Sequence, residues 1–166
     1  MANTVNPRGF EPVQPILRMR SYVKGTATKL FPGDAVVLRP DGKIYVAATA
    51  GTTLAGVSVG YATAAATRVL IYDDPAQQYY IQDDGVSGTL AQADIGAGFN
   101  IVVTAGNTTF LKSAQALDTD TKNTATAARA CVLLGFHPDD TVGKNVRCRV
   151  SFNYAKNPQT RGSTFM

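Results

Sequence analysis

The stretch AVVLRPDGKIYVA, residues 35–47, decides the fold class. Two runs rich in β-branched and other apolar residues flank the tripeptide Pro40-Asp-Gly. Proline presets φ, Asp41 bonds back to the backbone, and Gly42 takes positive φ, so the tripeptide favours a tight turn. The stretch therefore predicts a β-hairpin.

Outward from this hairpin, the chain contains further short apolar runs bounded by turn residues. Residues 145–153 alternate with period two, which places Val146, Cys148, Val150 and Phe152 on one face of a strand. Further candidate strands lie at 26–31, 54–61, 67–72, 78–82, 99–103, 108–112 and 130–136. Helical periodicity is weak, and only 89–94 and 124–129 could form a helical turn.

Short strands at a spacing of roughly 8–15 residues, with no alternating helices, are typical of antiparallel architectures. The sequence therefore predicts an all-β chain with a single antiparallel β-sandwich or barrel, jelly-roll-like or β-tulip-like. We place this body at residues 25–154. A chain of 166 residues with 45% hydrophobic residues can bury a core of that size without disulfides.

The ends differ from the body. Residues 1–24 contain three prolines within nine positions (Pro7, Pro12 and Pro15), which favours an extended N-terminal arm. Its apolar residues indicate that the arm lies on a surface, either its own body or a neighbour. Residues 155–166 form a short polar C-terminal tail that ends in Phe165-Met166.

Charge is distributed unevenly along the chain. Residues 1–24 carry four basic and one acidic residue (+3), 25–143 carry seven and eleven (−4), and 144–166 carry five basic residues and no acid (+5). Basic ends on an acidic body indicate an acidic partner, either nucleic acid or an acidic protein face. Because the basic residues are not interleaved with exposed aromatics on one sheet, we do not expect nucleic acid.

The sequence offers few groups for catalysis or metal binding. His137 is the only histidine and precedes Pro138 at a strand end, so we expect it at the surface. Cys131 and Cys148 lie in apolar runs and are expected as buried thiols, with a disulfide or metal pair as the alternative. Aspartate pairs at 73–74, 83–84 and 139–140 flank Pro or Gly, which favours turn chemistry over catalysis or calcium.

These patterns predict a protein that is not an enzyme and has no cofactor, catalytic residue or metal ligand. No secretory signal pattern opens the chain, and no apolar run reaches the ~18 residues of a membrane span, so we expect no membrane contact.

The chain resembles the small capsid decoration proteins (cement or head-stabilising proteins) of tailed bacteriophages. The resemblance runs through most of its length, in the order and spacing of turns and strand ends. It rests on residues 1–4, 6–7, 9–10, 12–13, 31–36, 42–44, 54–57, 72–75, 93–96, 116–118, 134–136 and 138–140. At 14–18, Gln-Pro-Ile-Leu-Arg stands where the family often has an aromatic or His-rich stretch.

The resemblance implies a structural protein on the outer surface of the virion, made in the host cytoplasm, that binds the major capsid protein and bridges capsomers. It implies self-association, with a homotrimer preferred and a dimer as the alternative. Two other hypotheses remain open. The chain is a different virion component, such as a fibre base or a receptor- or glycan-binding knob, or it is an enzyme or carbohydrate-binding domain.

The arm and the tail are the predicted contact segments for the capsid or a neighbouring copy. The expected arm contacts are Arg8, Phe10, Val13, Ile16, Leu17, Arg18 and Arg20. The expected tail contacts are Lys156, Arg161 and Phe165.

Overall fold

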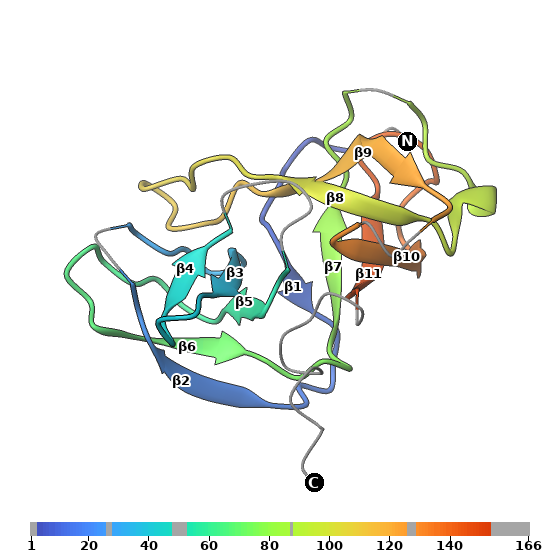
Figure 1. Ribbon diagram of the computed structural model, residues 1–166. Coiled ribbons are helices and arrows are strands. Elements are labelled where there is room, and N and C mark those ends of the chain that lie inside the picture. The colour runs from blue at the N-terminus through green and yellow to red at the C-terminus, as the bar shows by residue number, and fades with distance from the viewer. Residues whose placement is uncertain (1–2, 26–27, 48–52, 87, 126–128, 154–166) are drawn as a thin grey trace, which may run out of the picture.

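The chain was analysed as a computed structural model, which describes residues 3–25, 28–47, 53–86, 88–125 and 129–153. Within these ranges it is almost entirely β, with two antiparallel sheets, and the all-β sandwich prediction is confirmed. The sheets do not close into a barrel. Figure 1 shows the five-stranded sheet beside the six-stranded one, with long loops joining them.

The six-stranded sheet has the order β1-β7-β11-β10-β8-β9. Its strands are β1 (Glu11–Pro12), β7 (Gln78–Gln82), β8 (Gly98–Val102), β9 (Ala116–Asn123), β10 (Cys131–Phe136) and β11 (Arg147–Phe152). The β10–β11 register shifts between Leu133 and Gly135. The alternation predicted for 145–153 is observed, since Cys148, Val150 and Phe152 are buried while Arg149 is exposed.

The five-stranded sheet has the order β2-β6-β5-β3-β4. Its strands are β2 (Met19–Val23), β3 (Ala35–Leu38), β4 (Ile44–Val46), β5 (Gly56–Ser58) and β6 (Arg68–Tyr72). The predicted hairpin is β3–β4, paired from Val36↔Val46 to Leu38↔Ile44, and Gly42 in its turn has φ +73°. Beyond the end of β2, an isolated bridge from Lys24 to Ile44 brings the two edges of this sheet together.

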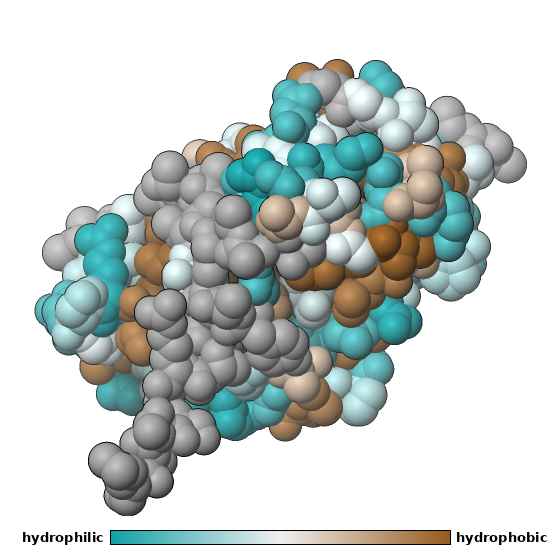
Figure 2. Space-filling model, turned by 45° about the vertical axis from the view of Figure 1, so that its right-hand side comes forward, coloured by the Kyte–Doolittle hydropathy of each residue, from teal (hydrophilic) through white to brown (hydrophobic). Residues whose placement is uncertain are grey.

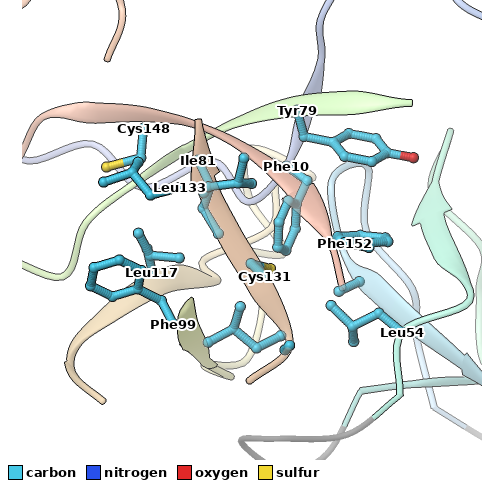
Figure 3. Close-up of a cluster of buried hydrophobic side chains, with 14 of the residues drawn as sticks. Phe10, Leu54, Tyr79, Ile81, Phe99, Leu117, Cys131, Leu133, Cys148 and Phe152 are labelled. Atoms are coloured by element: carbon cyan, nitrogen blue, oxygen red, sulfur yellow. The ribbon is translucent and has the colours of Figure 1, made fainter. Parts of the chain in front are cut away.

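Two clusters of buried apolar side chains pack against the sheets. The larger cluster contains residues of both sheets, including Ala35 and Val57 from one and Phe99 and Val150 from the other, so it joins them. Figure 3 shows its side chains converging from several strands. The smaller cluster lies on the opposite face of the five-stranded sheet, around Ile71 and Leu30.

Local predictions differ from the structure at three places. Of the predicted strand 26–31, the described residues 28–31 contain only an isolated bridge from Leu30 to Ala62. Residues 108–112, predicted as a strand, form a turn closed by a bridge between Asn107 and Lys112. Residues 116–123 were not predicted as a strand, yet they form β9. The 89–94 segment contains a helical turn, as predicted, in the form of the 3₁₀ turn η1 (Gln92–Asp94). The other helical candidate, 124–129, lies partly outside the described residues.

Candidate functional site

The N-terminal segment, residues 3–24, is the predicted contact segment, and its described residues are integrated into the body. β1 pairs with β7 and β2 pairs with β6, so the segment contributes a strand to each sheet. It is extended, as predicted, and it lies on its own body. The predicted boundary between residues 24 and 25 therefore does not separate an arm from the fold.

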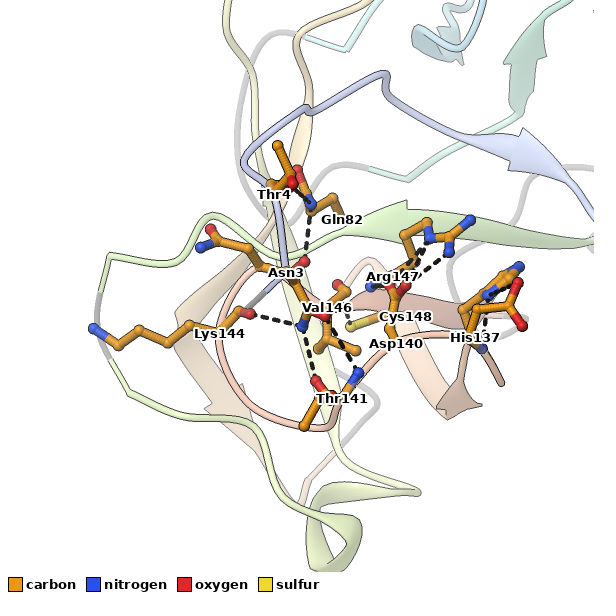
Figure 4. A network of polar contacts seen from close by, with 12 residues as sticks. Asn3, Thr4, Gln82, His137, Asp140, Thr141, Lys144, Val146, Arg147 and Cys148 are labelled. Carbon is orange, nitrogen blue, oxygen red and sulfur yellow. Dashed lines mark hydrogen bonds and ion pairs between the residues drawn. The ribbon is translucent and has the colours of Figure 1, made fainter. Parts of the chain in front are cut away.

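Two amide side chains, the buried Gln82 and the half-buried Asn3, fasten the start of the segment (Figure 4). The Gln82 amide donates to the carbonyls of Thr4 and Asn145 (both 2.8 Å) and accepts from the Asn6 N–H (2.7 Å). Asn3 donates to the carbonyls of Thr141 (2.8 Å) and Lys144 (3.0 Å). Because these bonds satisfy extended backbone that has no sheet partner, they hold residues 3–6 in place.

Phe10 anchors the segment in the core. Its side chain is 2% exposed and packs edge-to-face against Tyr79 (5.8 Å between ring centroids) and Phe152 (5.3 Å). Gly9, with φ +71°, lets the backbone approach Ser113 and Gly33, where a Cβ would lie about 2.4–2.6 Å from their atoms. The buried ring itself offers a partner almost no surface, although Phe10 also lines a groove on this side of the chain.

A second amide holds the middle of the segment. Gln77 is buried, and it donates to the Val13 carbonyl (2.8 Å) and accepts from the Leu17 N–H (3.0 Å). Val13 and Ile16 are half-buried between these bonds, whereas the Leu17 side chain is exposed. Of the three apolar residues predicted here, Leu17 offers the most surface to a partner.

Asp73, after β6, pairs with two arginines near the end of the segment. Its carboxylate is fully buried, accepts from Arg18 Nε (2.9 Å) and the Tyr22 hydroxyl (2.6 Å), and forms an ion pair with Arg20. Although burial opposes it, these bonds lower the pKa of Asp73. Arg18 and Arg20 were predicted to meet an acidic partner, yet each already has an internal one.

Arg8 is as accessible as Arg20 and does not contact Asp73. Its side chain is about half exposed and lies 3.8 Å from Glu11, a weak surface pair. The predicted tail residues Lys156, Arg161 and Phe165 lie outside the described residues.

A polar groove of about 300 Å³ lies between the start of the segment and the strands β7 and β11. Arg147 binds Asp140 in the groove through Nη2–Oδ1 (2.7 Å) and Nε–Oδ2 (3.0 Å), which lowers the pKa of Asp140. Tyr80 lines the groove, and its ring lies 4.8 Å from that of His137. His137, expected at the surface, is half-buried just after β10.

No protein-family model and no curated protein matches this chain.

The described cysteines and aspartates form no second candidate site. Cys131 and Cys148 are buried free thiols, as predicted. Within the described ranges, no three His, Cys, Asp or Glu side chains lie where they could hold a metal ion. No helix in that part of the chain is long and apolar enough to cross a membrane. Asp140 lies in a turn, as predicted, with its N–H donating to the His137 carbonyl (3.1 Å), and the side chains of Asp73 and Asp140 also bind arginines.

Sequence reasoning missed the residues that dock the segment. Gln77, Gln82 and Asp73 belong to turns or strand ends and carry no motif. One available signal was the concentration of amides at 77, 78 and 82 beside an apolar strand, because a buried amide requires hydrogen-bond partners.

Proposed function

We propose that this chain is a structural virion protein of a tailed bacteriophage. In this role it binds the outer surface of the major capsid shell, bridges neighbouring capsomers, and stabilises the shell, with a homotrimer as the expected assembly. The resemblance described above is the starting point. The single structural observation that supports it best is the extended N-terminal segment, which adds an edge strand to each sheet and presents apolar and basic side chains outward.

These outward side chains define a contact strip: Val5, Arg8, Leu17, Met19 and Arg20. Because hydrogen bonds already fix the backbone beneath it, binding through the strip requires little additional ordering of the chain. Only 17% of all residues are charged, so little charge must be desolvated at a broad protein interface. Figure 2 shows apolar residues in several patches separated by polar ones on the face in view. Many weak contacts of this kind sum over a shell through multivalency.

Purified wild-type chain, added to empty heads that lack it, tests the proposal. We expect saturable binding and a higher temperature of head rupture. Deleting residues 1–20 would be a poor test, because it also removes the buried Phe10 and β1. Leu17→Ser combined with Met19→Ser changes only exposed side chains of the strip.

The matched control is Ile95→Ser, an exposed apolar residue outside the strip. The double variant should bind heads more weakly, and the control should bind like wild type. Equal binding by all three would refute the strip as the contact surface. Absence of wild-type binding to heads would refute the decoration function itself.

A fibre-base or glycan-binding role is the second candidate, and the polar groove supports it. Sugars bind sites that combine an aromatic ring with amides and charged groups, and Tyr80, Gln82, Arg147 and Asp140 line this groove. A glycan array distinguishes the two functions. A hit that Tyr80→Ala abolishes, without binding to heads, would favour glycan recognition.

A further inference from the structure

The turn between β8 and β9 holds two apolar side chains in solvent. Phe110 is 69% exposed and Leu111 is 44% exposed. The turn is also firmly seated on the body. The Ser113 N–H donates to the Pro32 carbonyl (3.2 Å), and Gly106 lies against the Phe31 ring so closely that a Cβ would be 2.3 Å from it.

Hydrogen bonds define the conformation of this tip, residues 107–112. Asn107 and Lys112 exchange backbone bonds of 2.7 and 3.2 Å. The Asn107 side-chain oxygen accepts from the N–H groups of Thr109 (2.8 Å) and Phe110 (3.0 Å). Leu111 has φ +49°, an unfavourable region for leucine that the surrounding bonds must enforce. The tip therefore presents Phe110 on a preorganised backbone.

A groove of about 210 Å³ lies at the foot of the same tip, because Lys112 lines it. Its apolar walls come from the N-terminal segment, the 31–33 turn and the strand ends around β5 and β6, through Pro12, Pro32, Val59 and Tyr72. Arg8 and Glu11 add charged groups of both signs. An apolar cavity of about 150 Å³ accommodates benzene, so this groove has room for a phenyl ring.

We propose that Phe110 of one copy of this chain inserts into this groove on a second copy. The tip and the groove lie on the same face of the molecule, since both adjoin Lys112. A twofold axis can then place each tip in the partner's groove, which gives the closed, isologous contact of a dimer, the alternative to the trimer that the resemblance favours. In that arrangement Lys112, two residues after the inserted ring, approaches the acidic Glu11 at the partner's groove.

The charge of the tip favours a protein partner over the two other classes of macromolecule. Residues 104–112 carry one charge, Lys112. Binding to nucleic acid relies on several cations that neutralise phosphates, and stable attachment to an anionic membrane requires more apolar area or more basic residues than this tip has. A rigid aromatic side chain that fills a pocket is a common centre of protein–protein contacts.

Sedimentation velocity of the purified full-length chain over a wide concentration range tests the proposal. Wild type should self-associate, and Phe110→Ser should raise the dissociation constant by at least about 30-fold, as loss of a central aromatic contact does. Val86→Ser is the matched control, because Val86 is 73% exposed and is not part of the tip or the groove. Wild type that stays monomeric at 100 µM (about the upper limit for a weak contact) overturns the proposal.

A mixing experiment separates this contact from other modes of association. Phe110→Ser keeps the groove, and Val59→Glu keeps the tip but places a charge in the groove. Each variant alone should remain monomeric, and an equimolar mixture should associate, because one of the two contacts is restored. Unfolding midpoints close to that of wild type establish that both variants are folded.

An equimolar mixture that stays monomeric, or Phe110→Ser that associates like wild type, overturns the proposal. The proposal is also overturned if wild type does not self-associate but binds phosphatidylserine vesicles, and Phe110→Ser does not bind them. The tip would then be a membrane anchor. The proposal does not depend on capsid binding, so either can fail alone.

Discussion

Replacing Asp83 by asparagine should stabilise the protein at neutral pH. Asp83 follows β7 and is 2% exposed, and neither of its carboxylate oxygens accepts a hydrogen bond of good geometry from the described residues, although the backbone at Val146 and Gly85 partly offsets the burial. Burial raises the pKa of Asp83 to about 6, from an ordinary value of 3.8. The native state therefore carries a group that prefers to be neutral.

The pH dependence has a definite sign. Because the folded chain binds this proton more tightly than the unfolded chain, the free energy of unfolding falls as pH rises from about 4 to about 6. The interval spans about two pH units at about 1.4 kcal/mol each, so the full loss above pH 6 is about 3 kcal/mol. An asparagine side chain in this place cannot ionise, but its buried amide also lacks assured partners, which costs about 1–3 kcal/mol.

We therefore expect Asp83→Asn to unfold at a higher urea concentration than wild type at pH 7.5, by up to about 2 kcal/mol in free energy of unfolding. This advantage should shrink and then reverse towards pH 4. The difference between the two proteins is the informative quantity, because lowered pKa values at Asp73 and Asp140 make the absolute stability of both rise over the acidic range.

Asp84→Asn is the matched control for this prediction. Asp84 is only half-buried and accepts a hydrogen bond from the Thr119 hydroxyl (2.7 Å), so its replacement should not stabilise the chain. The reasoning is refuted if Asp83→Asn changes the free energy of unfolding by the same amount at pH 4.5 and pH 7.5.

Three other substitutions or treatments probe the docked segment and the core. Phe10→Ala should lower the free energy of unfolding by about 3–5 kcal/mol in urea titrations, as for other buried aromatics; a value below ~1 kcal/mol would mean that the ring does not belong to the core. Asp73→Asn leaves two arginines with a weakened partner and should cost about 3 kcal/mol, with faster amide hydrogen exchange in β2; unchanged exchange would contradict it. Cys131 and Cys148 should resist a thiol reagent in the native protein, because burial raises the pKa of both, and should react after unfolding in urea; rapid native labelling would exclude burial.

The local hairpin was predictable because all of its determinants lie within thirteen consecutive residues. Pro40-Asp-Gly fixes the turn, and the flanking runs fix the strands. β9 was not predictable in the same way. Its residues Asp118 and Asp120 are typical of loops and metal sites, and only pairing with β8 and the bond from the Asp84 N–H to the Leu117 carbonyl makes the segment a strand.

The error at residues 108–112 has the opposite cause. Thr108-Thr-Phe-Leu-Lys has high β-propensity, yet the Asn107 side chain caps two N–H groups and turns the chain back. A short local bond of this kind competes with strand formation. Propensity therefore identified an apolar, β-prone segment correctly but could not show that its Phe110 is left in solvent.

The placement of the N-terminal segment required contacts far apart in sequence. Prolines and basic residues indicated an extended arm, but β1 pairs with residues 79–80, and the Gln82 amide reaches residues 4 and 6. Nothing near residue 10 in the sequence distinguishes a phenylalanine that packs in the core of its own chain from one that contacts a partner protein. Only the aromatic pair at Tyr79 and Phe152 decides it.

The internal pairing of the arginines changes how a partner can be held. An arm with free Arg18 and Arg20 would attach mainly through charge, and its affinity would fall steeply with added salt. In the folded chain both arginines pair with the single carboxylate of Asp73, which offsets one of their two charges, and Arg8 is partly compensated by Glu11. The surface left for a partner therefore combines a reduced positive charge with apolar side chains on fixed backbone, such as Leu17 and the Phe110 tip. A contact built on these gains its free energy from burial of apolar area, so it persists at ionic strengths at which surface charges are screened.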